Sequence, residues 1–223
     1  MTPTSNELLV TLEQKISPDK AALLVIDVQN DFVADKGFFA GVGADVGVIQ
    51  RRTIPPLLRL IDAARAAGVL VVFVQAIYDP QDLSPAMRER NLRTGRDTPR
   101  CLTGSWGADF FSVRPTQDDV VVIKHRYSAM INTGLNELLK ERGIESLLLT
   151  GVSTDTCVES TGRDAYFMDY YVTMVSDCCG AVSDADHSGA LARFDRDYGA
   201  IVTSDEVINS WAALGAGARR KIA

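Results

Sequence analysis

The chain has 223 residues, of which 46% are hydrophobic, so it can bury one sizeable core but not two. Charged residues make up 23% of the chain, which is typical of a folded domain rather than of a disordered segment. The formal net charge of -6 disfavours nucleic acid as a partner, because affinity for a phosphate backbone comes mainly from Lys and Arg. We therefore expect a single domain spanning residues 1–223.

Nothing in the sequence indicates a membrane segment or an export signal. The longest apolar runs, such as Val69 to Val74, are far shorter than the roughly 18 to 20 residues of a membrane-spanning helix. Residues 1–20 mix acidic and basic side chains and lack the apolar stretch of a secretory signal. We expect a cytoplasmic protein without a membrane partner. The cysteines have no spacing typical of a disulfide framework, and we expect free thiols at Cys101, Cys157, Cys178 and Cys179.

Short apolar segments alternate with amphipathic ones along the chain. This alternation predicts crossover units around a parallel β-sheet. Several of the apolar runs are almost continuous, which is typical of strands covered by helices on both faces. Strands are predicted at residues 21–28, 69–75, 120–124, 146–151, 171–176 and 200–203.

Helices are predicted between these strands. In residues 54–67, Leu57, Leu58 and Ile61 recur at helical spacing, and Gly68 follows as a stop signal. Further helices are predicted at residues 133–142, 155–168 and 184–198.

Two segments are expected to lie outside this regular pattern. Residues 79–117 contain several prolines and many polar side chains, which predicts a long connection, with short helices at most. Long connections in compact domains are often functional. The C-terminal residues 215–223 are expected to fray.

Three reactive side chains stand at the ends of predicted strands, where parallel sheets flanked by helices bind ligands. Asp27 lies near the end of the first strand, Lys124 ends the third, and Cys157 follows the fourth in the expected first turn of a helix. A helix N-terminus and a nearby ammonium both favour a thiolate. Each residue alone is more often structural, but three at one edge predict a nucleophilic site.

The segments around these residues resemble the signatures of the isochorismatase-like cysteine hydrolases. They are LLVIDVQNDF (23–32), VIKHRYSA (122–129) and TGVSTDTCVESTGRDA (150–165). The resemblance extends over about residues 20–210. It implies a three-layer αβα sandwich with a six-stranded parallel sheet, and a catalytic triad of Asp27, Lys124 and Cys157.

The resemblance implies a cysteine mechanism. Asp27 takes the thiol proton of Cys157, Lys124 stabilises the charges, and the thiolate attacks an amide or ureido carbonyl. Ammonia or an amine leaves, and water hydrolyses the thioester. The family also has a non-proline cis peptide, which falls here at Val152–Ser153. Backbone N–H groups around Ser153, Thr154 and Cys157 are expected to hold the oxyanion.

Two comparisons narrow the branch of the family. True isochorismate hydrolases, which cleave a vinyl ether, typically lack the cysteine, so Cys157 favours C–N hydrolysis. Nicotinamidases carry a metal site built from an Asp and histidines after the second strand. That segment reads QAIYDPQD here, and the chain's two histidines, His125 and His187, lie elsewhere in the sequence. We therefore expect no metal cofactor.

Other segments resemble the ureidoacrylate branch and related ureido or carbamoyl amidohydrolases. They are GSW (104–106), RYS (126–128) and CVESTGRDA (157–165). One departure matters: where ureidoacrylate hydrolases have Gln-Asn, this chain has Gln75-Ala76, which removes an amide that could contact the substrate. Ureidoacrylate, biuret-like compounds, N-carbamoyl acids and simple amides all stay open as substrates.

Several residues near the same edge are candidates to line a small pocket, although ordinary core packing explains each of them as well. The arginine-rich stretch 88–100 could clamp a substrate carboxylate. A solvated or subunit-facing loop neutralised by Glu89 and Asp97 is the favoured interpretation. The pocket candidates are Phe32, Gln75, Tyr78, Trp106 and Tyr127.

Other functions stay open besides a metal-independent cysteine amidohydrolase. The same scaffold could serve a non-catalytic small-molecule binder, or a hydrolase of the isochorismatase or nicotinamidase type. A redox thiol protein would need a resolving cysteine, for which Cys178 and Cys179 are candidates, although buried packing is the favoured role for both. The resemblance also implies a homodimer or homotetramer.

Overall fold

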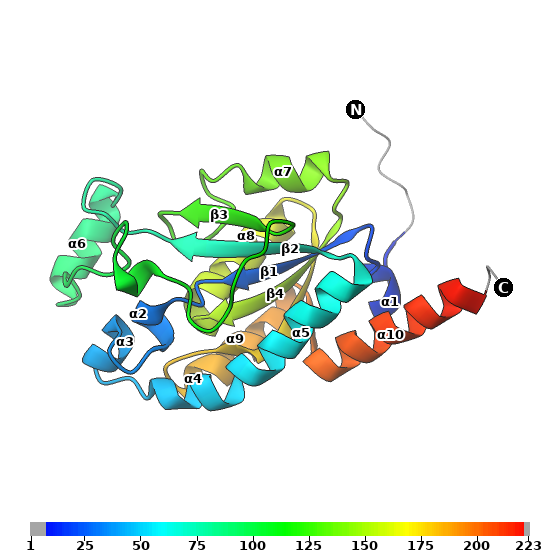
Figure 1. The fold of residues 1–223 in the computed structure, drawn as a ribbon. Coiled ribbons are helices and arrows are strands. Elements are labelled where there is room, and N and C mark those ends of the chain that lie inside the picture. The colour runs from blue at the N-terminus through cyan, green and yellow to red at the C-terminus, as the bar shows by residue number, and fades with distance from the viewer. Residues whose placement is uncertain (1–7, 221–223) are drawn as a thin grey trace.

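A computed structural model describes residues 8–220 and contains one sheet with the strand order β3-β2-β1-β4-β5-β6 (Figure 1). All neighbouring strands run parallel. The topology confirms the predicted α/β class with a six-stranded parallel sheet. The strands are β1 (Ala21–Ile26), β2 (Leu70–Ala76), β3 (Val120–Lys124), β4 (Ser146–Val152), β5 (Tyr171–Gly180) and β6 (Ala200–Val202).

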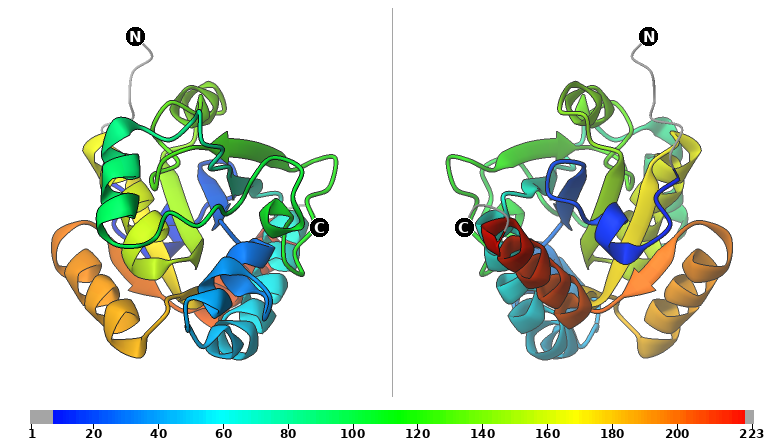
Figure 2. Two further views of the ribbon diagram at one scale, coloured as in Figure 1. Left: turned by 90° about the vertical axis from the view of Figure 1, so that its left-hand side faces the viewer. Right: turned by 90° about the vertical axis from the view of Figure 1, so that its right-hand side faces the viewer.

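Helices cover both faces of the sheet (Figure 2). On one face lie α4 (Val46–Arg52), α5 (Ile54–Ala67) and α10 (Ser204–Arg220), and on the other lie α7 (Leu135–Glu141), α8 (Glu159–Phe167) and α9 (Asp184–Asp197). Leu23 and Val25 of β1 pack toward the first group, whereas Leu24 and Ile26 pack toward the second. This arrangement is the predicted three-layer αβα sandwich.

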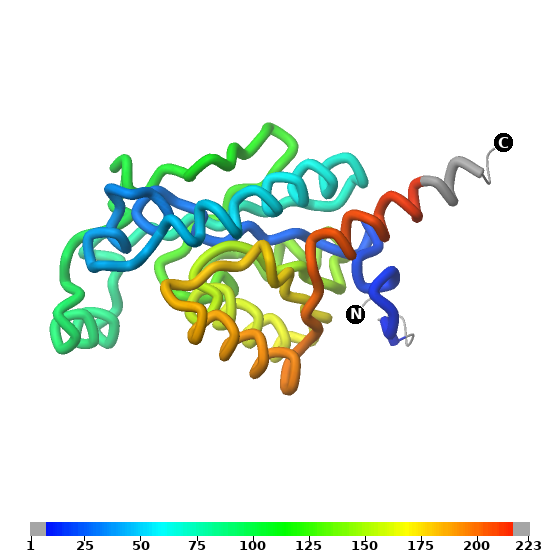
Figure 3. The backbone as a smooth tube through the Cα atoms, turned by 90° about the horizontal axis from the view of Figure 1, so that it is seen from below, coloured from blue at the N-terminus to red at the C-terminus, as the bar shows by residue number. Residues whose placement is uncertain are grey.

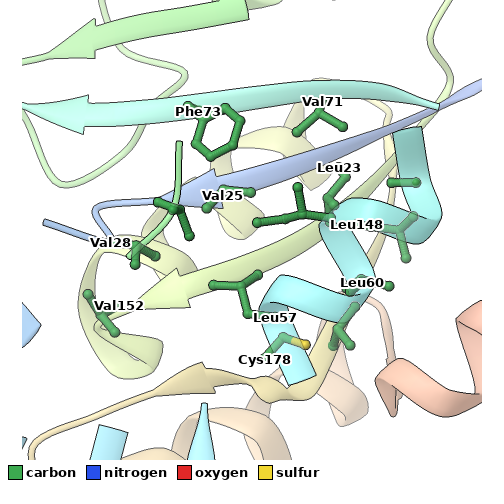
Figure 4. Packing of buried hydrophobic residues seen from close by; sticks show 14 of the residues in the cluster. Leu23, Val25, Val28, Leu57, Leu60, Val71, Phe73, Leu148, Val152 and Cys178 are labelled. Carbon is green, nitrogen blue, oxygen red and sulfur yellow. The ribbon is translucent and has the colours of Figure 1, made fainter. Parts of the chain in front are cut away.

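The central strands are buried along their whole length. Every residue of β1 and β4 is buried, as expected for strands that are apolar without alternation. Figure 4 shows the packing of α5 against this part of the sheet, with Leu57 and Leu60 lying near Leu23, Val25, Val71, Phe73 and Leu148.

The helix α5 begins and ends where the sequence predicts. Pro55 and Pro56 lie in its first turn, where a missing N–H costs nothing. Gly68 adopts a left-handed conformation at φ 78° and donates its N–H to the last turn.

Several short helices were not predicted, because one turn is too short to display a helical period. They are α1 (Leu12–Lys15), α2 (Asn30–Val33) and α3 (Phe38–Gly41). The long connection 79–117 contains α6 (Pro85–Arg93) and the 3₁₀ turn η1 (Trp106–Ala108).

The C-terminal segment is helical where fraying was expected. The helix α10 continues through residues 215–220, for which fraying was predicted, and residues 221–223 lie outside the described part of the chain. Val207 and Trp211 are buried in the core, and the indole N–H of Trp211 donates to the Ile16 carbonyl at 2.8 Å. Neither α10 nor any other helix within residues 8–220 has the length and apolar character needed to cross a bilayer.

The two ends of the sheet differ in what surrounds them. The short helices α2 and α3 and the helix α6 lie beyond the carboxyl ends of the strands, whereas α1 and α10 lie toward the opposite end (Figures 1 and 3). The carboxyl edge is therefore the edge at which irregular segments can form a site.

Gly151 of β4 lies where β4 closely approaches Ile26 of β1 at this edge. It has φ 109°, and a Cβ added there would collide with the backbone of Ile26. We predict that Gly151→Ala lowers the free energy of unfolding by about 3 kcal/mol, since a strained conformation and an overpacked contact add. Urea unfolding followed by circular dichroism measures the loss. Gly143→Ala is the matched control, because Gly143 has φ 67° with open space around it, and should lose only about 1 kcal/mol. Equal losses would contradict the close approach.

Candidate active site

The structure brings Asp27, Lys124 and Cys157 together at the carboxyl edge of the sheet. Asp27 follows β1, Lys124 ends β3, and Cys157 follows β4. The Lys124 ammonium lies 2.7 Å from a carboxylate oxygen of Asp27 and donates a 3.5 Å hydrogen bond to the Cys157 sulfur. The neighbours β1 and β4 mark the point where the strand order reverses, which is where open α/β sheets bind ligands.

The ion pair is closed off from water. The side chains of Asp27 and Lys124 are both 0% exposed. Lys124 also donates a hydrogen bond of 2.9 Å to the carbonyl of Arg126. An ammonium has three donors, so Asp27, Cys157 and Arg126 engage all of them and hold the Lys124 charge in one place.

Gln29, which the sequence analysis did not single out, holds the turn after β1 that contains Asp27. Asp27 has φ 54°, a conformation that Asp tolerates better than most residues. The buried amide of Gln29 accepts from the Ala76 N–H at 2.8 Å and donates to the carbonyls of Ala76 and Ala108. Gln29 thereby ties the turn after β1 to the end of β2. Its only sequence signal was a polar residue directly after an apolar strand.

Cys157 lies in an unusual turn. The peptide bond between Val152 and Ser153 is cis, at the position implied by the family resemblance. A π-helical turn, η2 (Thr154–Val158), follows in place of the first α-helical turn that the sequence predicted, and α8 begins only at Glu159. Thr161 donates its hydroxyl to the Cys157 carbonyl at 2.7 Å, which ties the turn that bears Cys157 to α8.

Burial dominates the protonation of the three groups. It raises the pKa of the Cys157 thiol to about 12, although the Lys124 charge opposes this effect. Burial also raises the pKa of Asp27 above its ordinary value, against the lowering effect of Lys124. For Lys124, burial lowers the pKa, but Asp27 and Cys157 outweigh it and keep the ammonium charged. The resting site therefore holds a thiol beside a carboxyl group with raised proton affinity.

Cys157 lines a cavity of about 540 Å³, which is large enough for a small molecule. Three of the predicted pocket residues, Phe32, Tyr78 and Tyr127, line this cavity together with Val152 and Ser153. Tyr78 is buried, and its ring centroid lies 5.8 Å from the Lys124 nitrogen. The aromatic wall thus adjoins the ion pair.

Two predicted pocket residues do not line the cavity. Gln75 donates its side-chain amide to the Ala108 carbonyl at 2.8 Å, so it stabilises the connection near η1. Trp106 is 52% exposed, and its backbone carbonyl accepts from the Asn30 side-chain amide and from the Asp109 N–H. Both residues were chosen because they lie near the carboxyl edge in the sequence. Position along the chain does not determine where a side chain points.

The cavity includes residues that the sequence analysis did not favour. Phe38 and Phe39 of α3 form part of its wall, as do Arg90, Arg96 and Arg100 from the arginine-rich stretch. Most of this stretch is exposed and Arg93 pairs with Glu89, as the favoured interpretation has it, whereas Arg100 is buried. The only available signal was its place in a long connection at the carboxyl edge.

One of the two histidines lies close in space to the segment after β2, although both are distant from it in the sequence. His125 lies beside the segment after β2, with Nδ1 2.8 Å from the Ile77 carbonyl and 3.6 Å from Asp82. His187 contacts the Thr154 hydroxyl at 2.9 Å. Within residues 8–220, no three His, Cys, Asp or Glu side chains are grouped so that they could hold a metal ion.

The remaining thiols, Cys101, Cys178 and Cys179, are buried. Burial raises the pKa of each above the ordinary value of a cysteine. Unlike Cys157, none of these three thiols lines the cavity formed by the described residues.

Comparison with known proteins identifies the family. Residues 21–207 match the isochorismatase domain. The chain belongs to the isochorismatase family. It is 34% identical over 206 residues to a ureidoacrylate amidohydrolase, RutB, from Variovorax paradoxus, in an alignment that covers 86% of this chain and 81% of that protein.

Solved structures of this hydrolase family agree with the fold. A cysteine hydrolase from Pseudomonas syringae pv. phaseolicola has a TM-score of 0.79 at 27% identity, covering 93% of this chain and 99% of that one. An N-carbamoylsarcosine amidase from Thermoplasma acidophilum has a TM-score of 0.68 at 30% identity, covering 83% and 97%. The recognition from the three sequence segments is thereby confirmed.

The buried ion pair predicts a specific stability pattern. Lys124→Met should lower the free energy of unfolding by about 3 to 5 kcal/mol, because it leaves Asp27 buried without a counter-charge. The double variant Asp27→Asn/Lys124→Met should recover most of that loss. Urea unfolding at pH 7.5 measures both values, with Lys140→Met, an exposed lysine on α7, as the control. A Lys124→Met variant as stable as the control would show that the pair does not hold the site together.

Proposed function

We propose that the protein is a cysteine amidohydrolase that cleaves a C–N bond of a small amide, ureido or carbamoyl compound without a metal. The observation that carries this proposal is the Lys124 ammonium, which contacts the Asp27 carboxylate and the Cys157 sulfur beside a cavity. A nucleophile, a base and a fixed positive charge within reach of one another are what such a reaction requires.

In the first half-reaction, Asp27 takes the proton of the Cys157 thiol as the sulfur attacks the substrate carbonyl carbon. The raised pKa of Asp27 suits it to accept this proton, because burial makes the neutral acid more favourable. Lys124 keeps its own proton and offsets the negative charge, whether this charge is on sulfur or on the carboxylate. The C–N bond then breaks as Asp27 returns the proton to the leaving nitrogen, and a thioester remains.

The turn before Cys157 supplies candidates for the oxyanion hole. The Ser153 carbonyl accepts hydrogen bonds from the N–H groups of Thr156 and Val158, each at 3.1 Å. The N–H of Cys157 lies between those two donors along the chain. An N–H at the nucleophile is suited to stabilise the oxyanion, and one preorganised donor contributes about 3 kcal/mol.

In the second half-reaction, water replaces the departed amine. Asp27 takes a proton from this water as its oxygen attacks the thioester carbonyl. The C–S bond breaks, the sulfur recovers the proton from Asp27, and a carboxylate or carbamate is released. The aromatic walls formed by Phe32, Tyr78 and Tyr127 limit the water that enters the cavity.

The relatives support this substrate range without selecting one compound. The RutB relative is named for ureidoacrylate, and a structural relative is named for N-carbamoylsarcosine. Both substrates contain a carbonyl carbon bonded to nitrogen. A non-catalytic binder on this scaffold would not require a thiol, a carboxylate and an ammonium in mutual contact. Release of ammonia from primary amides, N-carbamoyl acids, biuret or ureidoacrylate separates the two functions.

Cys157→Ser tests the nucleophile. The variant should keep its melting temperature while kcat falls by about 10⁴-fold or more, because a buried hydroxyl is a much weaker nucleophile. Ammonia release measures kcat, and mass spectrometry of acid-quenched wild type should detect the acyl adduct on Cys157. Cys178→Ala is the thiol control, because Cys178 lies in the core beside α5 and should leave kcat unchanged. Full turnover by Cys157→Ser would exclude the mechanism.

The pH dependence tests the proton transfer. We expect kcat/KM to rise on the acid side as Asp27 ionises, with an apparent pKa above the ordinary value of 3.8 because burial raises it. Above that limb the profile should stay level to about pH 9, since a thiol with a pKa of about 12 remains protonated until Asp27 removes its proton. A rate that climbs tenfold per pH unit between 7 and 9 would instead indicate a thiolate formed by simple ionisation. Initial rates in buffers of constant ionic strength give the profile.

A further inference from the structure

Arg100 is a buried cation in the wall of the active-site cavity. Its side chain is 8% exposed, and it lies at the end of the arginine-rich stretch that begins in α6. The guanidinium carbon lies 4.8 Å from the ring centroid of Phe38 and 5.4 Å from that of Tyr78. The two rings hold the guanidinium in position through cation–π contacts, without neutralising its charge.

Among residues 8–220, Arg100 has no carboxylate partner. One of its five donors bonds to the Arg96 carbonyl at 3.1 Å, and within residues 8–220 no Asp or Glu forms a salt bridge with it. Asp31, whose carboxylate lies next to residue 101, accepts from the backbone N–H groups of Phe38 and Cys101 instead. By contrast, the exposed Arg93 of the same stretch pairs with Glu89 at 2.9 Å. Arg100 is therefore a buried guanidinium without a salt bridge among the described residues.

The cavity presents this charge close to the nucleophile. Arg100 and Cys157 line the same space, and Arg90 and Arg96 line it as well. The ring of Tyr78 contacts the Lys124 ammonium as well as the Arg100 guanidinium, so a single aromatic ring separates the two cations. A small molecule with its carbonyl at Cys157 therefore has its far end within reach of Arg100.

The acidic groups of the cavity wall are already engaged. Asp155 accepts from the hydroxyls of Ser153 and Thr156. Asp186 accepts from the Ser183 hydroxyl at the start of α9. These carboxylates hold their own turns in place, whereas Arg100 retains free donors that are arranged to bind two oxygens at once.

We propose that Arg100 binds a carboxylate of the substrate, so that the enzyme acts on small acids carrying an amide or ureido group and discriminates against neutral amides. This inference rests on the proposed function and narrows its substrate class. The carboxylate supplies the counter-charge that the buried guanidinium lacks, and its binding places the scissile carbonyl over Cys157. Arg100 is thus a specificity-determining residue.

Paired substrates test this assignment. Each acid is compared with a neutral analogue of similar length: N-carbamoyl-β-alanine with butylurea, and succinamate with pentanamide. The wild type should hydrolyse the acids with kcat/KM about 100-fold higher, mainly through a lower KM. Arg100→Gln should lose this advantage while keeping its rate on the neutral compounds, and Arg100→Lys should restore part of it. Arg93→Gln, the matched exposed charge removal, should resemble the wild type.

A purely structural role for Arg100 would lower the rates on acids and neutral compounds alike, and that result would overturn the assignment. Equal rates of the wild type on both members of each pair would also overturn it.

Binding gives a readout independent of turnover. In the Cys157→Ala background, calorimetry should show succinamate binding at least about tenfold more tightly than pentanamide, and the added Arg100→Gln change should abolish the difference. If no compound is hydrolysed but this preference appears, the proposed function fails and the carboxylate site stands. If hydrolysis occurs and succinamate binds no better than pentanamide, the carboxylate site fails and the amidohydrolase stands.

Discussion

Lys124 carries a charge and three hydrogen-bond donors into a place that water does not reach, and each donor finds a partner there: Asp27, Cys157 and the carbonyl of Arg126. A lone buried ion is costly, so Asp27 and Lys124 must be buried together. Since β2 lies between β1 and β3, the pair also ties together strand ends that are not neighbours. In the proposed mechanism, this ion pair also determines when the Cys157 thiol can lose its proton, so Cys157 must lie beside it.

The site divides into two parts with different origins. The reacting groups follow strands or end them, so the parallel sheet itself holds them in register. One side of the cavity wall comes from segments outside the three layers, namely α2, α3 and the connection 79–117, and the other side from the end of β4, η2 and the start of α9. Such connections can change in length and composition at little cost to the core. In the proposed mechanism, the sheet supplies the chemistry, and the connection, through Arg100, selects the substrate.

The sequence predicted best where a residue contrasted with its surroundings. Asp27 and Lys124 were recognisable because a charge at the end of an apolar strand needs a partner. Gln75 and Trp106 are not among the cavity-lining residues, because one donates to the Ala108 carbonyl and the other is exposed, which their immediate neighbours in the sequence do not show. Arg100 could not be distinguished from the other arginines of its stretch, because burial of a loop residue depends on packing against α3 and Tyr78, which are distant in sequence.

The sequence by itself determined the order of strands and helices along the chain, the family and the residue types of the reacting groups, because hydrophobic period and strand-end polarity are local properties. Only the tertiary structure decided which groups touch: Lys124 with Asp27 and Cys157, Gln29 with Ala76, and Arg100 with two aromatic rings but no carboxylate. These contacts join residues that lie far apart along the chain. Their geometry follows from how the layers pack, and no local pattern encodes that.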